Sequence, residues 1–236
     1  MPTVPTYSQP NRQNPVLGHF DARTLAAYEK WTVGHDWDVF GTLNFIPNRK
    51  PHIDTAQKHW SRFWQKVDQL TYGQTAVRSG ARVERIVCTQ FGKMKDNPHL
   101  HFVAKSPIED IDVFCACLNA LWAATATVAA PPKSNEIYPI FSVKRTGGYL
   151  FHEYKQIDSQ TFNDRFTYLN TKEIILKPRA DTIDRLKSAA STKLLTDAQA
   201  ALPTHIENAK ARHVVKAKAQ GRFNKRNGLN KKRHAH

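Results

Sequence analysis

The chain has 236 residues, 40% of them hydrophobic, and a formal net charge of +15 at pH 7. This length predicts one domain with appendages, and no run reaches the roughly 18 apolar residues that a membrane span needs. Three cysteines (Cys88, Cys115 and Cys117) form no zinc-binding pattern, and their odd number argues against a disulfide scaffold. We therefore expect a cytoplasmic protein without a membrane partner.

The basic residues are concentrated at the C-terminal end. Residues 203–236 hold ten Lys/Arg and one acidic residue, which leaves a net charge of +6 on the other 202 residues. Such a segment favours binding to nucleic-acid phosphates, and a solubilising, disordered end is the alternative. We expect an extended or disordered N-terminus at 1–18, a folded domain at 19–200, and a basic helical or disordered tail at 201–236.

The apolar pattern predicts helices and strands in alternation. Asp21 is a suitable N-cap for a helix at 22–33, and a segment rich in strand-forming residues follows at 37–45. A second helix, at 54–70, carries a stripe of apolar residues at helical spacing, which we interpret as core packing. The stripe consists of Trp60, Phe63, Trp64, Val67 and Leu70.

Two further strands, at 83–91 and 99–104, are joined by a turn-rich connector and predict an antiparallel hairpin. Residues 106–109 (Ser-Pro-Ile-Glu) are typical of a capping box and predict a helix that begins there. A strand at 136–144 is expected near a sheet edge, because Pro139 interrupts its hydrogen-bond ladder.

The sequence beyond residue 144 is less regular. Gly147 and Gly148 predict a turn, and a helix can start at Tyr149. Residues 166–175 fit either a strand or a helix, and polar helical sequence continues from Asp181. The order of elements predicts an α+β fold, with a mostly antiparallel central sheet flanked by helices and a basic C-terminal tail.

Two histidines, His99 and His101, are separated by Leu100 within the predicted strand at 99–104. Because side chains alternate along a strand, both imidazoles point to one side and Leu100 points to the other. Two imidazoles on one face of a rigid strand can chelate a metal ion. A half-exposed polar face is the alternative interpretation.

These motifs, in this order, resemble the HUH endonuclease superfamily, specifically the small rolling-circle replication initiator (Rep) proteins of the single-tyrosine type. Residues 40–45 (Phe-Gly-Thr-Leu-Asn-Phe) resemble the family's first motif, a central strand. Residues 99–102 resemble its histidine–hydrophobe–histidine motif. The resemblance spans about Trp37 to Lys172 and implies an RRM-like sheet.

The resemblance also implies a divalent metal ion, Mg²⁺ or Mn²⁺, held by His99, His101 and a third polar ligand from the preceding strand. Gln90 stands at the matching place, where many family members have Glu; Glu84 and Asp96 are alternatives. An amide oxygen adds no negative charge, so we expect weaker metal affinity, and the imidazoles favour Mn²⁺ or softer metals.

The family's nucleophile is a tyrosine on a later helix. Tyr149 follows a predicted strand and fits this place best. The family's usual lysine, three positions on, is replaced here by His152. Lys144, Arg145 or Lys155 can supply the missing positive charge against the DNA phosphate.

Tyr168 is the alternative nucleophile. Lys172 lies four positions later, one turn away if the segment is helical. The sequence from Tyr168 to Glu173 also echoes the family's third motif with one extra residue. Tyr154 is a more remote candidate.

The implied function is metal-dependent nicking of single-stranded DNA at a plasmid or phage origin, through a 5′-phosphotyrosine intermediate, followed by rejoining. The implied partners are single-stranded or hairpin origin DNA and a host helicase and polymerase, because no Gly-x-x-x-x-Gly-Lys-Ser/Thr loop is present. A single-tyrosine transposase or relaxase shares this chemistry. A non-catalytic single-stranded nucleic-acid-binding module is the third hypothesis.

Overall fold

The computed structural model describes residues 22–92, 97–142, 149–151, 162–169 and 177–233, with side chains described as far as residue 215 except at positions 22, 24 and 213. Its elements are α1 (Ala22–Val33), β1 (Val39–Leu43), α2 (Ile53–Tyr72), α3 (Gln74–Arg78), β2 (Arg85–Gln90), β3 (His99–Ala104), α4 (Ile111–Thr125), β4 (Glu136–Pro139), α6 (Thr182–Ser188) and α7 (Thr192–Arg233). Short 3-10 turns lie at Pro47–Arg49 and Pro132–Ser134.

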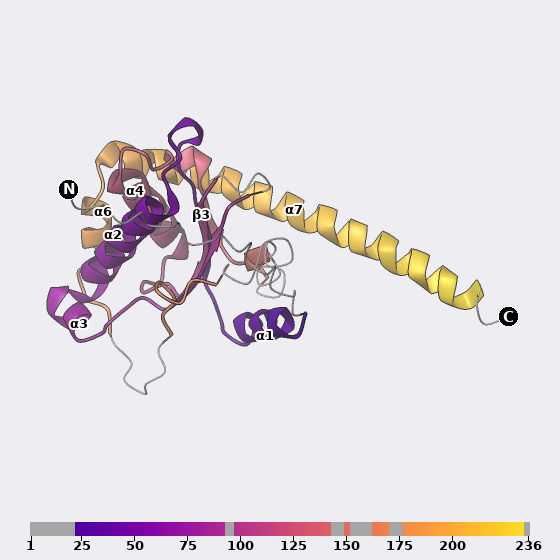
Figure 1. Ribbon diagram of the computed structural model, residues 1–236. Coiled ribbons are helices and arrows are strands. Elements are labelled where there is room, and N and C mark those ends of the chain that lie inside the picture. Colours follow the sequence, from indigo (N-terminus) through magenta and orange to yellow (C-terminus); the bar gives the residue numbers. More distant parts are fainter. Residues whose placement is uncertain (1–21, 93–96, 143–148, 152–161, 170–176, 234–236) are drawn as a thin grey trace, which may run out of the picture.

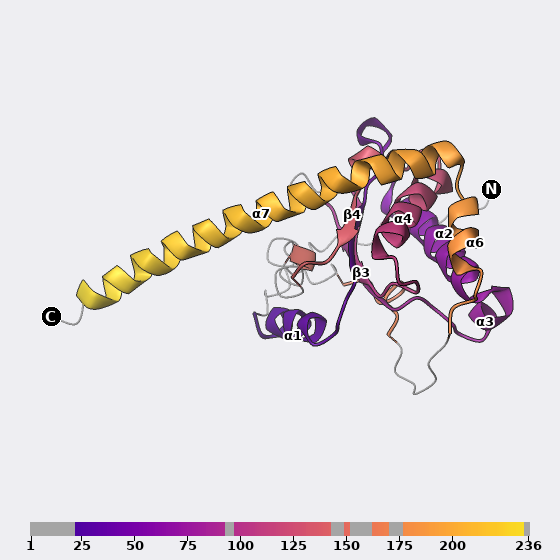
Figure 2. The same ribbon diagram turned by 180° about the vertical axis from the view of Figure 1, so that it is seen from behind.

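A four-stranded antiparallel sheet divides the molecule into two layers (Figure 1). Helices α2, α3, α4 and α6 gather on one side of the sheet, and α1 lies on the other, as the view from behind also shows (Figure 2). The expected α+β fold with an antiparallel sheet and flanking helices is therefore confirmed.

The strands lie in the order β2-β3-β1-β4. β2 and β3 form the expected hairpin, with Gln90 opposite His99, and β4 is at an edge, as Pro139 indicates. β1 and β3, which carry the two motifs of the resemblance, are the central strands. Along the outer edge of β2, isolated bridges join Phe162 to Cys88 and Tyr168 to Arg85.

The two faces of the sheet have different surroundings because side chains alternate along each strand. One face packs against α2, where the Trp64 and Phe102 rings meet edge to face at 5.1 Å between centroids. We call the other the histidine face. It carries Phe40, Thr42, Ile86, Cys88, Gln90, His99, His101, Val103, Glu136 and Tyr138.

The apolar stripe of α2 forms the core, as its helical spacing predicted. All five stripe residues are buried, and three of them, Trp60, Phe63 and Val67, are fully inaccessible. Burying each of these large side chains stabilises the fold by about 1.5–3 kcal/mol relative to leaving it exposed.

Gly41, in the middle of β1, makes room for a neighbouring ring. A Cβ built at this position would lie 2.1 Å from ring carbons of Phe102, its cross-strand partner on β3. Only glycine permits this contact, because a Cβ would have to displace a fully buried aromatic ring. The glycine lets Phe102 lie across β1 within the core.

The predicted start of α4 was wrong. The helix begins at Ile111, four residues later than the capping-box motif indicated, and its N-cap is Asp110, whose carboxylate accepts the N–H of Val113 at 2.9 Å. The Ser106 hydroxyl bonds locally to the Ile108 backbone instead, which favours a turn over a helix. A carboxylate also interacts favourably with the positive end of the helix dipole.

Helix α7 is long and only partly packed. It runs for 42 residues with Pro203 inside it; its first part lies against α4 and β4, and the rest extends away from the body (Figures 1 and 2). His205 of α7 is only 3% exposed, because this part of the helix packs against β4. Its Nδ1 accepts the N–H of Ile137 on β4 at 3.5 Å.

A buried ion pair joins α2 to β2. Arg85 donates from Nη1 and Nη2 to the two carboxylate oxygens of Asp68, at 2.7 and 3.0 Å, and Asp68 also accepts the Val83 N–H at 2.9 Å. The Arg85 guanidinium lies 4.4 Å from the Trp64 ring centroid and donates from Nε to the Phe166 carbonyl. One arginine therefore holds a helix, an edge strand and the 162–169 segment together.

We expect Asp68→Ala to lower the free energy of unfolding by about 3–5 kcal/mol, because it leaves the Arg85 charge buried without its carboxylate. Urea unfolding followed by circular dichroism measures this loss. The control is Asp197→Ala, which removes an exposed ion pair with Lys193 and should cost less than about 1 kcal/mol. Equal losses in the two variants would show that the buried pair has no special role.

Candidate active site

The two histidines of β3 lie side by side on the histidine face. Their ring centroids are 4.9 Å apart with the planes nearly perpendicular, at 87°. His101 is 2% exposed, between Cys88 of β2 and Thr42 of β1, whereas His99 is partly exposed near the end of the strand. The strand alternation expected from the sequence is confirmed.

Both histidines have a hydrogen bond on the same ring nitrogen. His99 Nδ1 lies 2.8 Å from the Asn97 carbonyl, which can only accept, so Nδ1 carries the proton and Nε2 of the neutral ring keeps a lone pair. His101 Nδ1 lies 2.8 Å from Thr42 Oγ1. When Nδ1 donates to this hydroxyl, Nε2 of His101 also keeps its lone pair, as metal-binding histidines require.

Gln90 lies opposite His99 on the neighbouring strand and is fully buried. Its Nε2 donates to the Leu150 carbonyl at 2.8 Å, which fixes the orientation of the amide. Its Oε1 is buried and accepts no hydrogen bond from the residues that the structure describes. A buried carbonyl oxygen without a donor costs free energy, and a cation would satisfy it.

This donor set suits a divalent cation. Two imidazole nitrogens and an amide oxygen leave further positions for oxygen ligands, a combination that favours Mn²⁺ over Ca²⁺. Among the described residues no group of three or more His, Cys, Asp and Glu could hold a metal ion, so the third ligand would be the amide. Cys88, opposite His101, is a poor ligand because burial raises the pKa of its thiol well above the usual range.

Glu84, an alternative ligand in the sequence analysis, is remote from the histidines. It precedes β2, whose first residue Arg85 pairs with Ala104, whereas Gln90, at the other end of β2, pairs with His99. At 3.3 Å per residue, about 20 Å of strand separates Glu84 from Gln90. Asp96, the other alternative, lies outside the described residues.

Tyr149 lies against the buried histidine. Its ring centroid is 5.4 Å from that of His101 and 5.6 Å from that of Phe40 on β1. Tyr149 is partly exposed, while Leu150 and Phe151, which follow it, are fully buried. Residues 149 and 150 are helical, in line with the helix expected at Tyr149. The Gln90–Leu150 hydrogen bond therefore connects the helical turn that carries Tyr149 to the strand that carries the third candidate ligand.

Tyr168 lies elsewhere. It pairs with Arg85 at the outer edge of β2, through hydrogen bonds of 2.8 Å in both directions. Roughly 16 Å of β2 separates this pairing from the end of the strand that faces His99. The structure thus brings the first of the two tyrosine candidates to the histidines and not the second.

Several predicted residues lie outside the described part of the chain. They are the candidate DNA-binding residues Lys144, Arg145 and Lys155, the alternative catalytic residue Lys172, and also His152 and Tyr154. Their roles stay predictions.

Sequence reasoning missed a residue that lies at this site. Arg212 of α7 places its guanidinium carbon 5.9 Å from the Tyr149 ring centroid, and its Nη1 donates to Glu136 at 2.6 Å. Tyr138 faces the same guanidinium, and burial raises the pKa of its phenol to about 12. No local motif marks Arg212, because 63 residues separate it from Tyr149; only its place in a basic segment hinted at a role.

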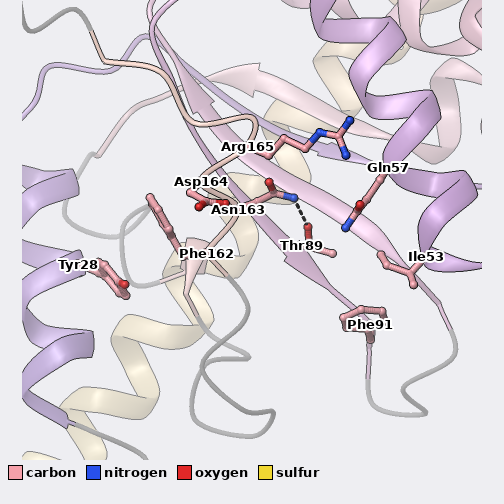
Figure 3. Close-up of a pocket in the computed structure, with 9 residues that line it drawn as sticks. All are labelled: Tyr28, Ile53, Gln57, Thr89, Phe91, Phe162, Asn163, Asp164 and Arg165. Atoms are coloured by element: carbon pink, nitrogen blue, oxygen red, sulfur yellow. Dashed lines mark hydrogen bonds between the residues drawn. The ribbon is translucent and has the colours of Figure 1, made fainter.

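A cavity of about 630 Å³ opens at the outer edge of β2. Its lining includes Thr89 and Phe91, the two neighbours of Gln90 in the chain. In Figure 3, Tyr28 and Phe162 stack on one side and Gln57 lies on the other. The cavity therefore adjoins the strand end that carries the third candidate ligand.

The polar group at the centre of this cavity is Asn163. Its Nδ2 donates to Thr89 Oγ1 at 2.9 Å, the dashed line in Figure 3, and its backbone N–H donates to Val87 at 2.9 Å. This bond holds the amide in place, and the polar side chains of Gln57, Asp164 and Arg165 also line the cavity. The cavity thus combines aromatic surfaces with a fixed amide.

Comparisons with known proteins identify no relative. No protein-family profile, no curated protein and no solved structure matches the chain. In the part of the chain that the structure describes, no helix is both long enough and apolar enough to cross a membrane. The assignment of function therefore depends on the geometry of the site.

We expect Gln90→Glu to lower the free energy of unfolding by about 1–3 kcal/mol in metal-free buffer at neutral pH. The carboxylate cannot donate to the Leu150 carbonyl, and it is fully buried. Urea unfolding in EDTA measures the loss. Gln74→Glu, the same change at an exposed position of α3, is the control and should be neutral within about 0.5 kcal/mol. A neutral result at both sites would mean that Gln90 does not hold the Tyr149 turn.

Proposed function

We propose that this protein is a metal-dependent DNA-nicking and strand-transfer enzyme of the single-tyrosine replication-initiator type, within the HUH superfamily. The observation that carries the proposal is the contact between the rings of His101 and Tyr149. His99 lies beside His101 on the same strand, and Gln90 lies opposite His99 on the neighbouring strand. A paired-histidine face with a phenol against it suits phosphodiester transesterification, because two imidazoles can hold a cation beside the attacking oxygen. A metal-free binding protein has no need of it.

In the proposed reaction the Tyr149 oxygen attacks the phosphorus of a phosphodiester in single-stranded DNA. A 5′-phosphotyrosine bond forms as the bond from phosphorus to the 3′ oxygen breaks; the phenol loses its proton and the departing oxygen gains one as a 3′-OH. That 3′-OH can prime a polymerase. The covalent link retains the bond energy, so a later 3′-OH can reverse the step and join strands without ATP.

His99, His101 and Gln90 would hold Mg²⁺ or Mn²⁺ at this site. A divalent cation bound there offsets the negative charge on the phosphate oxygens. The chain's own contribution is positional: Asn97 and Thr42 orient the two imidazoles, and the Gln90–Leu150 hydrogen bond fixes the turn that carries the phenol. Such preorganisation makes the attack effectively unimolecular.

The charge distribution supports a DNA partner. Residues 216–233 of α7 contain eight Lys/Arg and no acidic residue, and this part of the helix extends beyond the body (Figure 1). The cavity beside Gln90 suits an unpaired base, since aromatic rings stack on any base and an amide can bond to its edge. Unwinding and synthesis would fall to a host helicase and polymerase, and the three unpaired cysteines fit a reducing cytoplasm.

Two alternatives remain distinct from this proposal. A transposase or relaxase would use the same residues on different DNA ends, and the gene's neighbourhood separates the two. A non-catalytic single-strand binder would rely on the cavity and the basic helix alone, so its binding would be independent of metal and of Tyr149.

The decisive experiment tests for a covalent adduct. With Mn²⁺ and a single-stranded oligonucleotide from its own replicon's origin, the wild-type protein should become linked to the 5′ end of the downstream product. We expect Tyr149→Phe and EDTA to abolish the adduct, and Tyr168→Phe to retain it. Denaturing gels followed by mass spectrometry of the DNA-linked peptide measure the outcome.

The controls separate two kinds of failure. If Tyr149→Phe keeps the adduct and Tyr168→Phe loses it, the chemistry stands and the nucleophile is misassigned. If the wild-type protein forms no adduct on any candidate origin, the non-catalytic binder becomes the better description.

The cavity can be tested without catalysis. We expect Phe91→Ala to weaken binding of a 20-residue oligodeoxythymidine in EDTA by about 1–3 kcal/mol, the contribution of one stacked base. Fluorescence anisotropy measures the affinity. Ile183→Ala, which shortens an exposed apolar residue of α6, is the control and should leave affinity unchanged. Equal affinity in both variants would show that no base occupies the cavity.

A further inference from the structure

Arg212 is the part of α7 that reaches the proposed reaction centre. It comes from the helix that crosses β4, and it lies over the Tyr149 ring at 5.9 Å between the guanidinium carbon and the ring centroid. Its side chain is 34% exposed, so solvent and a ligand can approach it. His101 contacts the same tyrosine ring, so a candidate metal ligand and this arginine both lie against Tyr149.

The two ends of the Arg212 guanidinium differ in their bonding. Nη1 donates to Glu136 at 2.6 Å, which orients the planar group. Nη2 is buried without an acceptor at ideal hydrogen-bond geometry, and the Tyr138 hydroxyl is close enough to the guanidinium to interact with it. The rest of the side chain is partly exposed, and a phosphate oxygen is the acceptor that a guanidinium fits best.

We propose that Arg212 binds a non-bridging oxygen of the phosphodiester that Tyr149 attacks. The inference rests on the proposed function for the identity of the reaction, but the phosphate contact itself does not require nicking. A phosphate held beside Tyr149 needs a cation to offset its negative charge. Arg212 supplies it from α7, the helix that continues into the basic residues at 216–233.

Glu136 has a predictable effect on this contact. Its carboxylate orients Arg212 but also repels a phosphate placed beside the same guanidinium. A glutamine at position 136 keeps an oxygen that accepts from Nη1 and removes the negative charge. Glu136→Gln should therefore strengthen phosphate binding several-fold, whereas Arg212→Gln should weaken it.

The test measures how binding of a fluorescent 20-residue oligodeoxythymidine to the full chain depends on salt, in EDTA. Each phosphate contact with a single strand contributes about 0.7 to the slope of log affinity against log salt concentration. We expect Arg212→Gln to reduce the slope by about 0.7 and Arg212→Lys to keep most of it. Arg179→Gln, on the helix-covered side of the sheet and paired with Asp181, is the control and should leave the slope unchanged.

A second arm measures adduct formation with Mn²⁺ on the origin oligonucleotide. Arg212→Gln should slow the single-turnover rate by about 10²–10³-fold, as expected on removing one group that stabilises transition-state charge, and Arg212→Lys should fall between it and wild type. A reduced slope without any wild-type adduct would overturn the proposed reaction and leave the phosphate contact intact.

Three outcomes would overturn the inference itself. The first is an unchanged slope in Arg212→Gln when its urea unfolding matches wild type. The second is no binding of the oligonucleotide by the wild-type chain. The third applies if Arg212→Gln fails to fold. An oligonucleotide affinity of Glu136→Gln equal to that of the wild-type chain would then show that no phosphate lies beside this guanidinium.

Discussion

One hydrogen bond connects the two halves of the candidate site. Gln90 Nε2 donates to the Leu150 carbonyl, and through it the turn that carries Tyr149 is attached to the edge of a sheet whose neighbouring strand carries both histidines. The same bond orients the amide so that its oxygen is buried without a protein donor. A glutamate could not donate to this carbonyl at neutral pH, which gives a physical reason for glutamine at this position.

The sheet supplies the rigidity that this arrangement needs. β3 is paired on both sides, so His101 has a neighbour on each adjacent strand, while the opposite face is packed against α2. The Asp68–Arg85 pair then fixes β2 to that helix from behind. The site thus lies on a face whose backbone positions are determined by core packing, and the helical turn at residues 149–151 contributes the tyrosine.

The sequence predicted those parts of the molecule in which the local spacing of residues is compatible with only one kind of secondary structure. Period-two alternation gave the shared side of His99 and His101, and helical spacing gave the buried stripe of α2. The prediction from sequence was wrong at Ser106, which was expected to cap the helix. The Ser106 hydroxyl accepts the N–H of Ile108 in a local turn, and Asp110 caps the helix instead. The sequence also contained no sign of Arg212, because a contact between residues far apart in the chain leaves no local pattern.

Gly41 lies in the core of the sheet, and it also affects the position of a histidine at the candidate site. The glycine lets the Phe102 ring lie across β1, and the next residue, Thr42, provides the oxygen beside Nδ1 of His101. Any larger residue at position 41 would push β1 outward and carry that oxygen with it. The imidazole would then lose a hydrogen bond that orients its ring, so a steric change in the interior would alter the geometry of the opposite face of the sheet.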